Sequence, residues 1–175
     1  NGTLNISGTA DHMLSGNMNN QGLLVWSGAH LFFMNNGHIT NFTGASISDP
    51  CVSFDGRKIL FSMRPPAGGN RNIYEIGVDG AGLRQVTNGG GHDFDPQYLP
   101  DGTIMFTSSR ARHMDEYNHA PAENLYTCNA DGSSLKRVSF NMSDDFDPAL
   151  LPDGRVVYTR WEHFGTFNRF PLFFC

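Results

Sequence analysis

Residues 95–102 read DPQYLPDG, a stretch that opens with Asp-Pro and closes with Asp-Gly. The same pattern occurs twice more, as DPCVSFDG at residues 49–56 and as DPALLPDG at residues 147–154. Successive Asp-Pro pairs are 46 and 52 residues apart, and repeats of this length are typical of propellers and solenoids. The repeat is therefore the strongest indication of the fold.

Each repeat continues with the same series of β-rich runs and glycine turns. A second Asp-Gly pair, at Asp79-Gly80 and at Asp131-Gly132, precedes the last short run of the two complete units. Asp-Gly favours a tight turn because Asp bonds its own backbone and Gly tolerates a positive φ. The predicted strands after the first turn are residues 58–62, 103–108 and 155–159, then 72–76 and 124–128, then 83–87 and 135–139.

Four short strands per unit, without any helical period, predict an all-β fold. Four-stranded units that stack around an axis form a propeller. We therefore expect a partial β-propeller of four-stranded antiparallel blades, about three blades of a larger one. The expected parts are an Asn- and Gly-rich segment of unknown type at 1–27, then an incomplete propeller over 28–175 with a partial blade at 28–48, blades at 49–94 and 95–146, and a partial blade at 147–175.

The two ends of the chain resemble interrupted blades. Residues 31–34 and 39–40 are predicted to be the third and fourth strands of an earlier blade, and residues 172–175 align with 125–128, a third strand. We therefore expect neighbouring strands from elsewhere to cover the apolar side chains of the last segment, because open sheet edges and apolar groups would otherwise face water. These side chains are Phe170, Leu172 and Phe174.

Composition narrows the class of protein. Apolar residues make up 39% of the 175 residues and charged residues only 17%, which suits a compact β-fold. The formal net charge of −5 argues against a nucleic-acid surface, which needs clustered Lys and Arg. No apolar run approaches the roughly 20 residues of a membrane helix, so no transmembrane segment is expected.

The Asp-Pro repeats of residues 49–175 resemble those of TolB-type propellers. Three further segments, at residues 72–76, 82–87 and 151–163, are similar to the middle propeller domain of hydrazine synthase α-subunits and their relatives. The resemblance implies the architecture. It also implies export to the periplasm or the cell exterior, since most such relatives are large exported proteins.

The sequence contains no haem attachment motif, and in hydrazine synthase the chemistry lies at c-type haems outside the propeller blades. The three cysteines fit neither a CxxC zinc site nor a CxxCH haem site. Because Cys128 and Cys175 take equivalent positions in successive blades, about 10 Å apart, we expect no disulfide between them, and none of the three cysteines to be bridged within the chain. No Gly-x-Ser-x-Gly elbow, P-loop or dinucleotide fingerprint occurs, so no catalytic constellation is recognised.

Paired carboxylates precede two of the repeats, at Asp93 and Asp95 and at Asp145 and Asp147. Side chains at i and i+2 of an extended chain point to the same side, and two carboxylates there are possible Ca²⁺ ligands. A structural role at the entry to the first strand also accounts for them, and the repetition favours it. These four residues are the metal candidates.

Two further segments are candidates for a ligand or partner surface. The loop from Ser109 to Glu123 is the longest connection and is rich in His, Arg and carboxylates. A second segment follows a strand at residues 160–164. Arg110 and Arg160 lie at even spacing from an aromatic residue, which predicts that each meets an Asp of a neighbouring blade. The candidates are Arg110, His113, His119, Arg160, Trp161 and His163.

Two functions fit these observations. The first is a binding and scaffolding module, which presents loops to other subunits or to the remainder of its own chain. The second is a structural domain that walls or gates an active site carried elsewhere, in a haem protein similar to hydrazine synthase or in a propeller-gated peptidase.

Overall fold

The computed structural model describes residues 32–35, 38–41, 44–117, 119–164 and 166–175, and it contains strands and turns but no helix in these ranges. Two four-stranded antiparallel sheets form its centre, as the repeat predicts. Blade 1 consists of β3 (Ser46–Val52), β4 (Lys58–Arg64), β5 (Asn72–Gly77) and β6 (Arg84–Gln85). Blade 2 consists of β7 (Asp93–Tyr98), β8 (Ile104–Ser108), β9 (Asn124–Cys128) and β10 (Lys136–Arg137).

A third sheet, blade 3, follows in the same order. It contains β11 (Asp145–Leu150), β12 (Val156–Arg160) and β15 (Leu172–Phe174), and the hairpin of β13 (Glu162–Phe164) and β14 (Phe167–Arg169) interrupts it. The predicted strand at residues 172–175 is thus confirmed. In and just before this strand, the residues Phe170, Leu172 and Phe174 are more than half exposed, as expected for an uncovered sheet edge.

The predicted strands near the N-terminus are also present. They form the antiparallel hairpin of β1 (Phe32–Asn35) and β2 (His38–Asn41). The predicted segment 1–27 lies outside the described residues. No helix of the described chain has the length and apolarity needed to cross a membrane.

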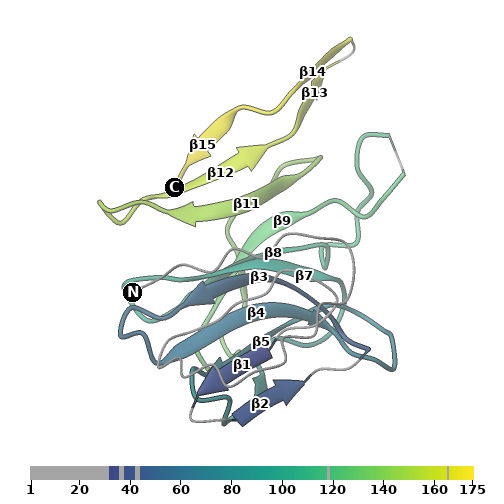
Figure 1. Cartoon of the computed structure of the whole chain (residues 1–175). Coiled ribbons are helices and arrows are strands. Elements are labelled where there is room, and N and C mark those ends of the chain that lie inside the picture. The colour runs from purple at the N-terminus through teal and green to yellow at the C-terminus, as the bar shows by residue number, and fades with distance from the viewer. Residues whose placement is uncertain (1–31, 36–37, 42–43, 118, 165) are drawn as a thin grey trace, which may run out of the picture.

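The blades lie side by side through their first strands. In each blade the first strand lies at one edge of the sheet, and β7 contacts both β3 and β11 (Figure 1). First strands that meet in this way line the axis of a propeller. The three blades form an open arc around that axis, so the fold is a partial β-propeller.

Each Asp-Pro pair forms a β-bulge within the first strand. Asp49, Asp95 and Asp147 have positive φ angles of 57°, 49° and 52°, and the strand register shifts at each of them. The prediction that Asp marks the strand entry was therefore wrong, since each strand begins two or three residues earlier. Pro has no N–H for the ladder, so a bulge accommodates the pair without losing a hydrogen bond.

Apolar side chains fill the space between blades. One cluster joins Leu60, Ile73 and Val86 of blade 1 to Ile104 and Phe106 of blade 2. A second joins blade 2 to blade 3. Because side chains alternate along a strand, residues next to Leu60 such as Phe61 pack on the other face of blade 1. Blades 1 and 2 are therefore buried on both faces, which explains their nearly continuous apolar strands.

All three cysteines are free, and we expect a thiol reagent to count three per chain in the denatured, unreduced protein. In the native protein Cys175, which is exposed, should react first. Cys128 should react last, because it is buried and burial raises the pKa of its thiol to about 11. A count of one thiol in the denatured protein would show a disulfide and would require a different blade register.

Candidate functional site

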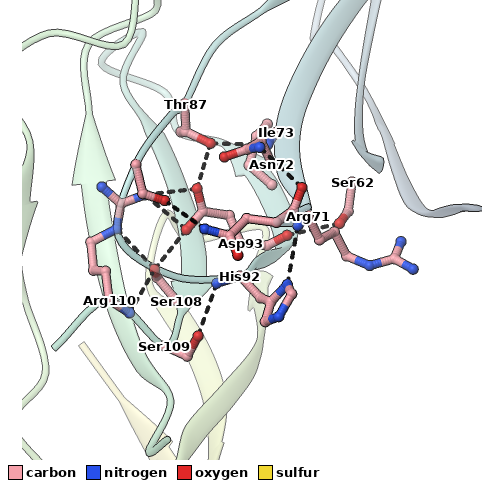
Figure 2. A network of polar contacts seen from close by, with 12 residues as sticks. Ser62, Arg71, Asn72, Ile73, Thr87, His92, Asp93, Ser108, Ser109 and Arg110 are labelled. Carbon is pink, nitrogen blue, oxygen red and sulfur yellow. Dashed lines mark hydrogen bonds and ion pairs between the residues drawn. The ribbon is translucent and has the colours of Figure 1, made fainter. Parts of the chain in front are cut away.

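Asp93 is the centre of a buried polar network between blades 1 and 2 (Figure 2). Its carboxylate accepts hydrogen bonds from the hydroxyls of Thr87 and Ser108 and from Arg110 Nη2, at 2.7–2.8 Å to both oxygens for the arginine. Thr87 Oγ1 in turn accepts from the backbone N–H of Ile73 at 2.9 Å. The network ties the last strand of blade 1 to the first strand of blade 2.

Asp145 and Arg160 repeat this arrangement in blade 3, with Arg160 Nε donating to Asp145 Oδ1 at 2.7 Å. The predicted Asp–Arg pairs therefore exist, but each Asp belongs to the first strand of the same blade as its arginine. The prediction of a neighbouring blade was wrong because the strand begins before the Asp-Pro pair. Arg110 and Arg160 thus bind the buried carboxylates of blades 2 and 3.

The bulges separate the carboxylates that the sequence placed on one side. Asp93 and Asp145 bind arginines, whereas Asp95 is influenced by the charges of Asp49 and Asp147. An extra residue in a strand changes the face to which later side chains point, so i and i+2 no longer share a side. Among the described residues, no group of three or more His, Cys, Asp or Glu side chains is arranged to hold a metal ion.

Five carboxylates gather near the axis of the described blades. The backbone N–H of Asp95 donates to Asp49 Oδ2 at 3.5 Å, which links two first strands. Burial, together with Asp49 and Asp147, raises the pKa of Asp95 to about 6. Burial and the charges of Asp144, Asp95 and Asp147 raise the pKa of Glu123 to about 7. None of the five forms an ion pair within the described residues, and we call Asp49, Asp95, Glu123, Asp144 and Asp147 the axial carboxylates.

Glu75 shows the contrasting case of a compensated carboxylate. Burial alone would raise its pKa, but hydrogen bonds from Lys58, Arg84 and Tyr98 hold the pKa below its ordinary value. Arg84 lies 2.8 Å and Lys58 3.1 Å from Glu75 Oε1. The structure therefore pairs the buried carboxylates of Glu75, Asp93 and Asp145 with basic side chains. The partly buried Asp95 and Glu123 have no such ion pair among the described residues.

We expect the stability of the fold to fall as the pH rises through the range set by Asp95 and Glu123. Their folded-state pKa values of about 6 and 7 exceed the ordinary values of 3.8 and 4.5, so the folded state binds more protons. Their contribution is complete below about pH 4 and is lost as the pH rises through about 6 and 7. At pH 8, Asp95→Asn should therefore have a free energy of unfolding about 1–2 kcal/mol higher than that of the wild type, and should unfold at a higher urea concentration.

The difference between Asp95→Asn and the wild type should be small near pH 4, where Asp95 is protonated in the folded protein. Asp101→Asn is the matched control, because Asp101 lies exposed in the turn of the same blade. Urea unfolding curves at pH 4, 6 and 8 measure the effect. A stabilisation of Asp95→Asn that is equal at all three pH values would contradict this account.

The long loop of blade 2 meets the hairpin of blade 3 in a second cluster. Tyr117 Oη lies 2.6 Å from His163 Nε2, and His163 Nδ1 lies 2.9 Å from Glu116 Oε2. The Tyr117 ring stacks on Trp161 and on His119, with ring centres 5.5 and 5.7 Å apart. Three candidate residues from two segments of the sequence thus contact the same side chain, that of Tyr117. They are His119, Trp161 and His163.

His113 lies at the edge of this region, where its Nε2 is 3.3 Å from the carbonyl oxygen of Asn141. Sequence reasoning did not single out Tyr117, although this residue connects the two segments. The sequence did contain a signal for this contact, because residues 109–123 and 161–171 each join the second strand of a blade to the third, in adjacent blades. Equivalent connections of neighbouring blades emerge at the same end of a propeller.

The arc of three blades, two of them four-stranded and one three-stranded, has a bulged Asp-Pro pair in each first strand and defines the chain as part of a β-propeller. The model of the TolB beta propeller domain matches residues 30–162. The chain therefore belongs to the TolB β-propeller family.

Relatives in this family are much longer proteins. The chain is 26% identical over 166 residues to hydrazine synthase subunit alpha of Kuenenia stuttgartiensis, covering 66% of the chain and 20% of the relative. It is 27% identical over 117 residues to the Tol-Pal system protein TolB of Francisella tularensis, covering 67% of this chain and 25% of the relative. The chain thus spans between a fifth and a quarter of the length of these two relatives.

Solved structures agree with this fold. Hydrazine synthase from Kuenenia stuttgartiensis superposes with a TM-score of 0.70 and 24% identity, covering 83% of this chain and 26% of that one. TolB from Acinetobacter baumannii gives a TM-score of 0.60 with 25% identity, covering 77% of this chain and 31% of that one.

Proposed function

We propose that this chain is a binding and scaffolding module of a larger exported protein, and that it receives a positively charged group of its partner at the axial carboxylates. The observation that carries the proposal is the gathering of the five axial carboxylates, none of which forms an ion pair with a described residue. Burial and their mutual charges raise the pKa of Asp95 to about 6 and that of Glu123 to about 7. Asp95 and Glu123 are partly buried, and carboxylates with perturbed pKa values are concentrated at functional sites. A Lys, an Arg or an N-terminal amine of a partner would supply the missing charge. The partner is another subunit or another part of the same protein.

Binding of a short Lys-rich peptide at pH 8, measured by isothermal titration calorimetry, tests this proposal. We expect binding to the wild type, at least tenfold weaker binding to Asp95→Asn/Glu123→Gln, and wild-type binding to Asp101→Asn. A Glu-rich peptide of equal length should not bind. Equal affinity of the double variant and the wild type would overturn the proposal, as would loss of binding in the Asp101→Asn control.

A second function is favoured by the similarity to hydrazine synthase subunit alpha. In this alternative the propeller walls or gates an active site on another domain of a haem enzyme, or of a peptidase. Haem absorbance of the native full-length protein would favour the haem enzyme, and reaction with a serine-directed fluorophosphonate would favour the peptidase. If the native protein shows neither, the binding module is the better account.

Export to the periplasm or the cell exterior is part of the proposal. It is supported by the resemblance of the Asp-Pro repeats to exported propellers. Fractionation of the native host tests it, and recovery of the protein in the cytoplasmic fraction would contradict it.

A further inference from the structure

Glu116, His163 and Tyr117 form a continuous chain of hydrogen bonds that the binding function does not use. The two distances, 2.9 Å from Glu116 Oε2 to His163 Nδ1 and 2.6 Å from His163 Nε2 to Tyr117 Oη, are those of good hydrogen bonds. A carboxylate oxygen only accepts hydrogen bonds, so Nδ1 of the neutral imidazole carries the proton and donates a hydrogen bond to Glu116. Nε2 is then the acceptor, and the Tyr117 hydroxyl donates to it.

The arrangement matches the general geometry of an activated nucleophile. Such a site needs a hydroxyl within hydrogen-bond reach of a base, and a third group that orients the base. Here Tyr117 is the hydroxyl, His163 the base and Glu116 the orienting group. Tyr117 is 44% exposed, so the residue lies at the protein surface.

The surroundings hold these groups in place. Trp161 and His119 stack on the Tyr117 ring at 5.5 and 5.7 Å between ring centres, and the His163 ring lies 4.4 Å away. Trp161 also stacks on Phe170 at 6.3 Å, which anchors the cluster to blade 3. The loop of blade 2 supplies the hydroxyl and the carboxylate, whereas blade 3 supplies the base. Sequence motifs that rely on neighbouring residues cannot detect such a site.

We propose that Tyr117 is a base-activated nucleophile that accepts an acyl group from an activated ester. The Tyr117 oxygen attacks the ester carbonyl carbon while its proton passes to His163 Nε2. Collapse of the tetrahedral intermediate breaks the bond to the alkoxide or phenolate leaving group. The leaving group takes the proton from His163, or His163 releases this proton to water. The products are O-acyl-Tyr117 and the free alcohol or phenol, and Glu116 stabilises the imidazolium that forms in between.

The test uses the whole chain, with its cysteines blocked, and p-nitrophenyl acetate as the probe. We expect one equivalent of p-nitrophenol to be released rapidly per chain, and peptide mass spectrometry to locate one acetyl group on Tyr117. The rate should exceed that of N-acetyltyrosine amide at the same pH by roughly 100-fold or more. Acetylation of Tyr117 at the rate of the free amino acid would overturn the proposal.

Three variants separate activation from folding. Tyr117→Phe keeps the ring and its stacking, and should lose the rapid release entirely. Glu116→Gln leaves Tyr117 and His163 in place, and should slow acetylation of Tyr117 by at least tenfold. His163→Gln removes the base and should reduce the rate to that of free tyrosine. If His163→Gln keeps a native circular dichroism spectrum and acetylates at the wild-type rate, the three residues only join the blades and the proposal fails.

Discussion

Asp93→Ala is expected to lower the free energy of unfolding by about 3–5 kcal/mol, because it leaves a nearly buried arginine without its counter-ion. Asp93 is fully buried, and the Arg110 side chain is only 11% exposed. Arg110 lies over the rings of Phe106 and Tyr126, so water cannot easily replace the lost carboxylate. Urea denaturation followed by circular dichroism measures the loss.

Asp153→Ala is the matched control for this substitution. Asp153 also pairs with an arginine, Arg155, but both side chains are at least half exposed. Exposed ion pairs contribute little because water screens them. The expected loss is therefore much smaller than for Asp93→Ala, and equal losses for the two variants would contradict the role assigned to Asp93.

Blade 1 shows how the buried ion pair can be replaced. Ile47 pairs with Met63 at the register position that Asp145 and Arg160 occupy in blade 3. Asp145→Ile alone should be strongly destabilising, since it leaves Arg160 unpaired. Asp145→Ile/Arg160→Met should recover most of the loss, because Met can pack on Phe173 where the Arg160 guanidinium now lies 4.4 Å from the ring centre.

Much of the fold could be predicted from the repeat. Each Asp-Gly turn sets the spacing of two strands, and three repeats of the same turns predict three sheets in sequence. The bulges could not be predicted in this way, because counting by twos assumes an unbroken strand. One residue with positive φ, such as Asp95, changes which later side chains share a face. For this reason the prediction that Asp93 and Asp95 point to the same side of the strand was wrong.

The candidate site was predicted in part. The arginines at even spacing from Phe106 and Tyr158 do bind carboxylates, because cross-strand neighbours follow from strand periodicity. The contact between Tyr117 and His163 depends on the path of an irregular loop, and periodicity contains no information about that path. The raised pKa of Glu123 likewise arises from residues of three segments that only the fold brings together.

Gly132→Ala is expected to destabilise the protein by roughly 3–5 kcal/mol, since it combines backbone strain with a collision between blades. Gly132 has a φ of +85°, and a Cβ there would collide with the carbonyl oxygen of Val86. Val86 follows the last strand of blade 1, so the methyl group would push the outer parts of blades 1 and 2 apart. The backbone atoms of Val86 cannot move away easily, because its N–H donates to the carbonyl oxygen of Ile73 at 2.8 Å.

Gly102→Ala separates the two contributions. Gly102 has the same φ of +85°, but a Cβ there would meet no atom within 4 Å. Its substitution should therefore cost only the strain of the left-handed conformation, about 1–2 kcal/mol. The difference between the two variants, measured by urea unfolding, is the energy of the contact between the turn at Gly132 and blade 1. If both variants lose the same stability, the outer edges of these blades lie further apart than the structure places them.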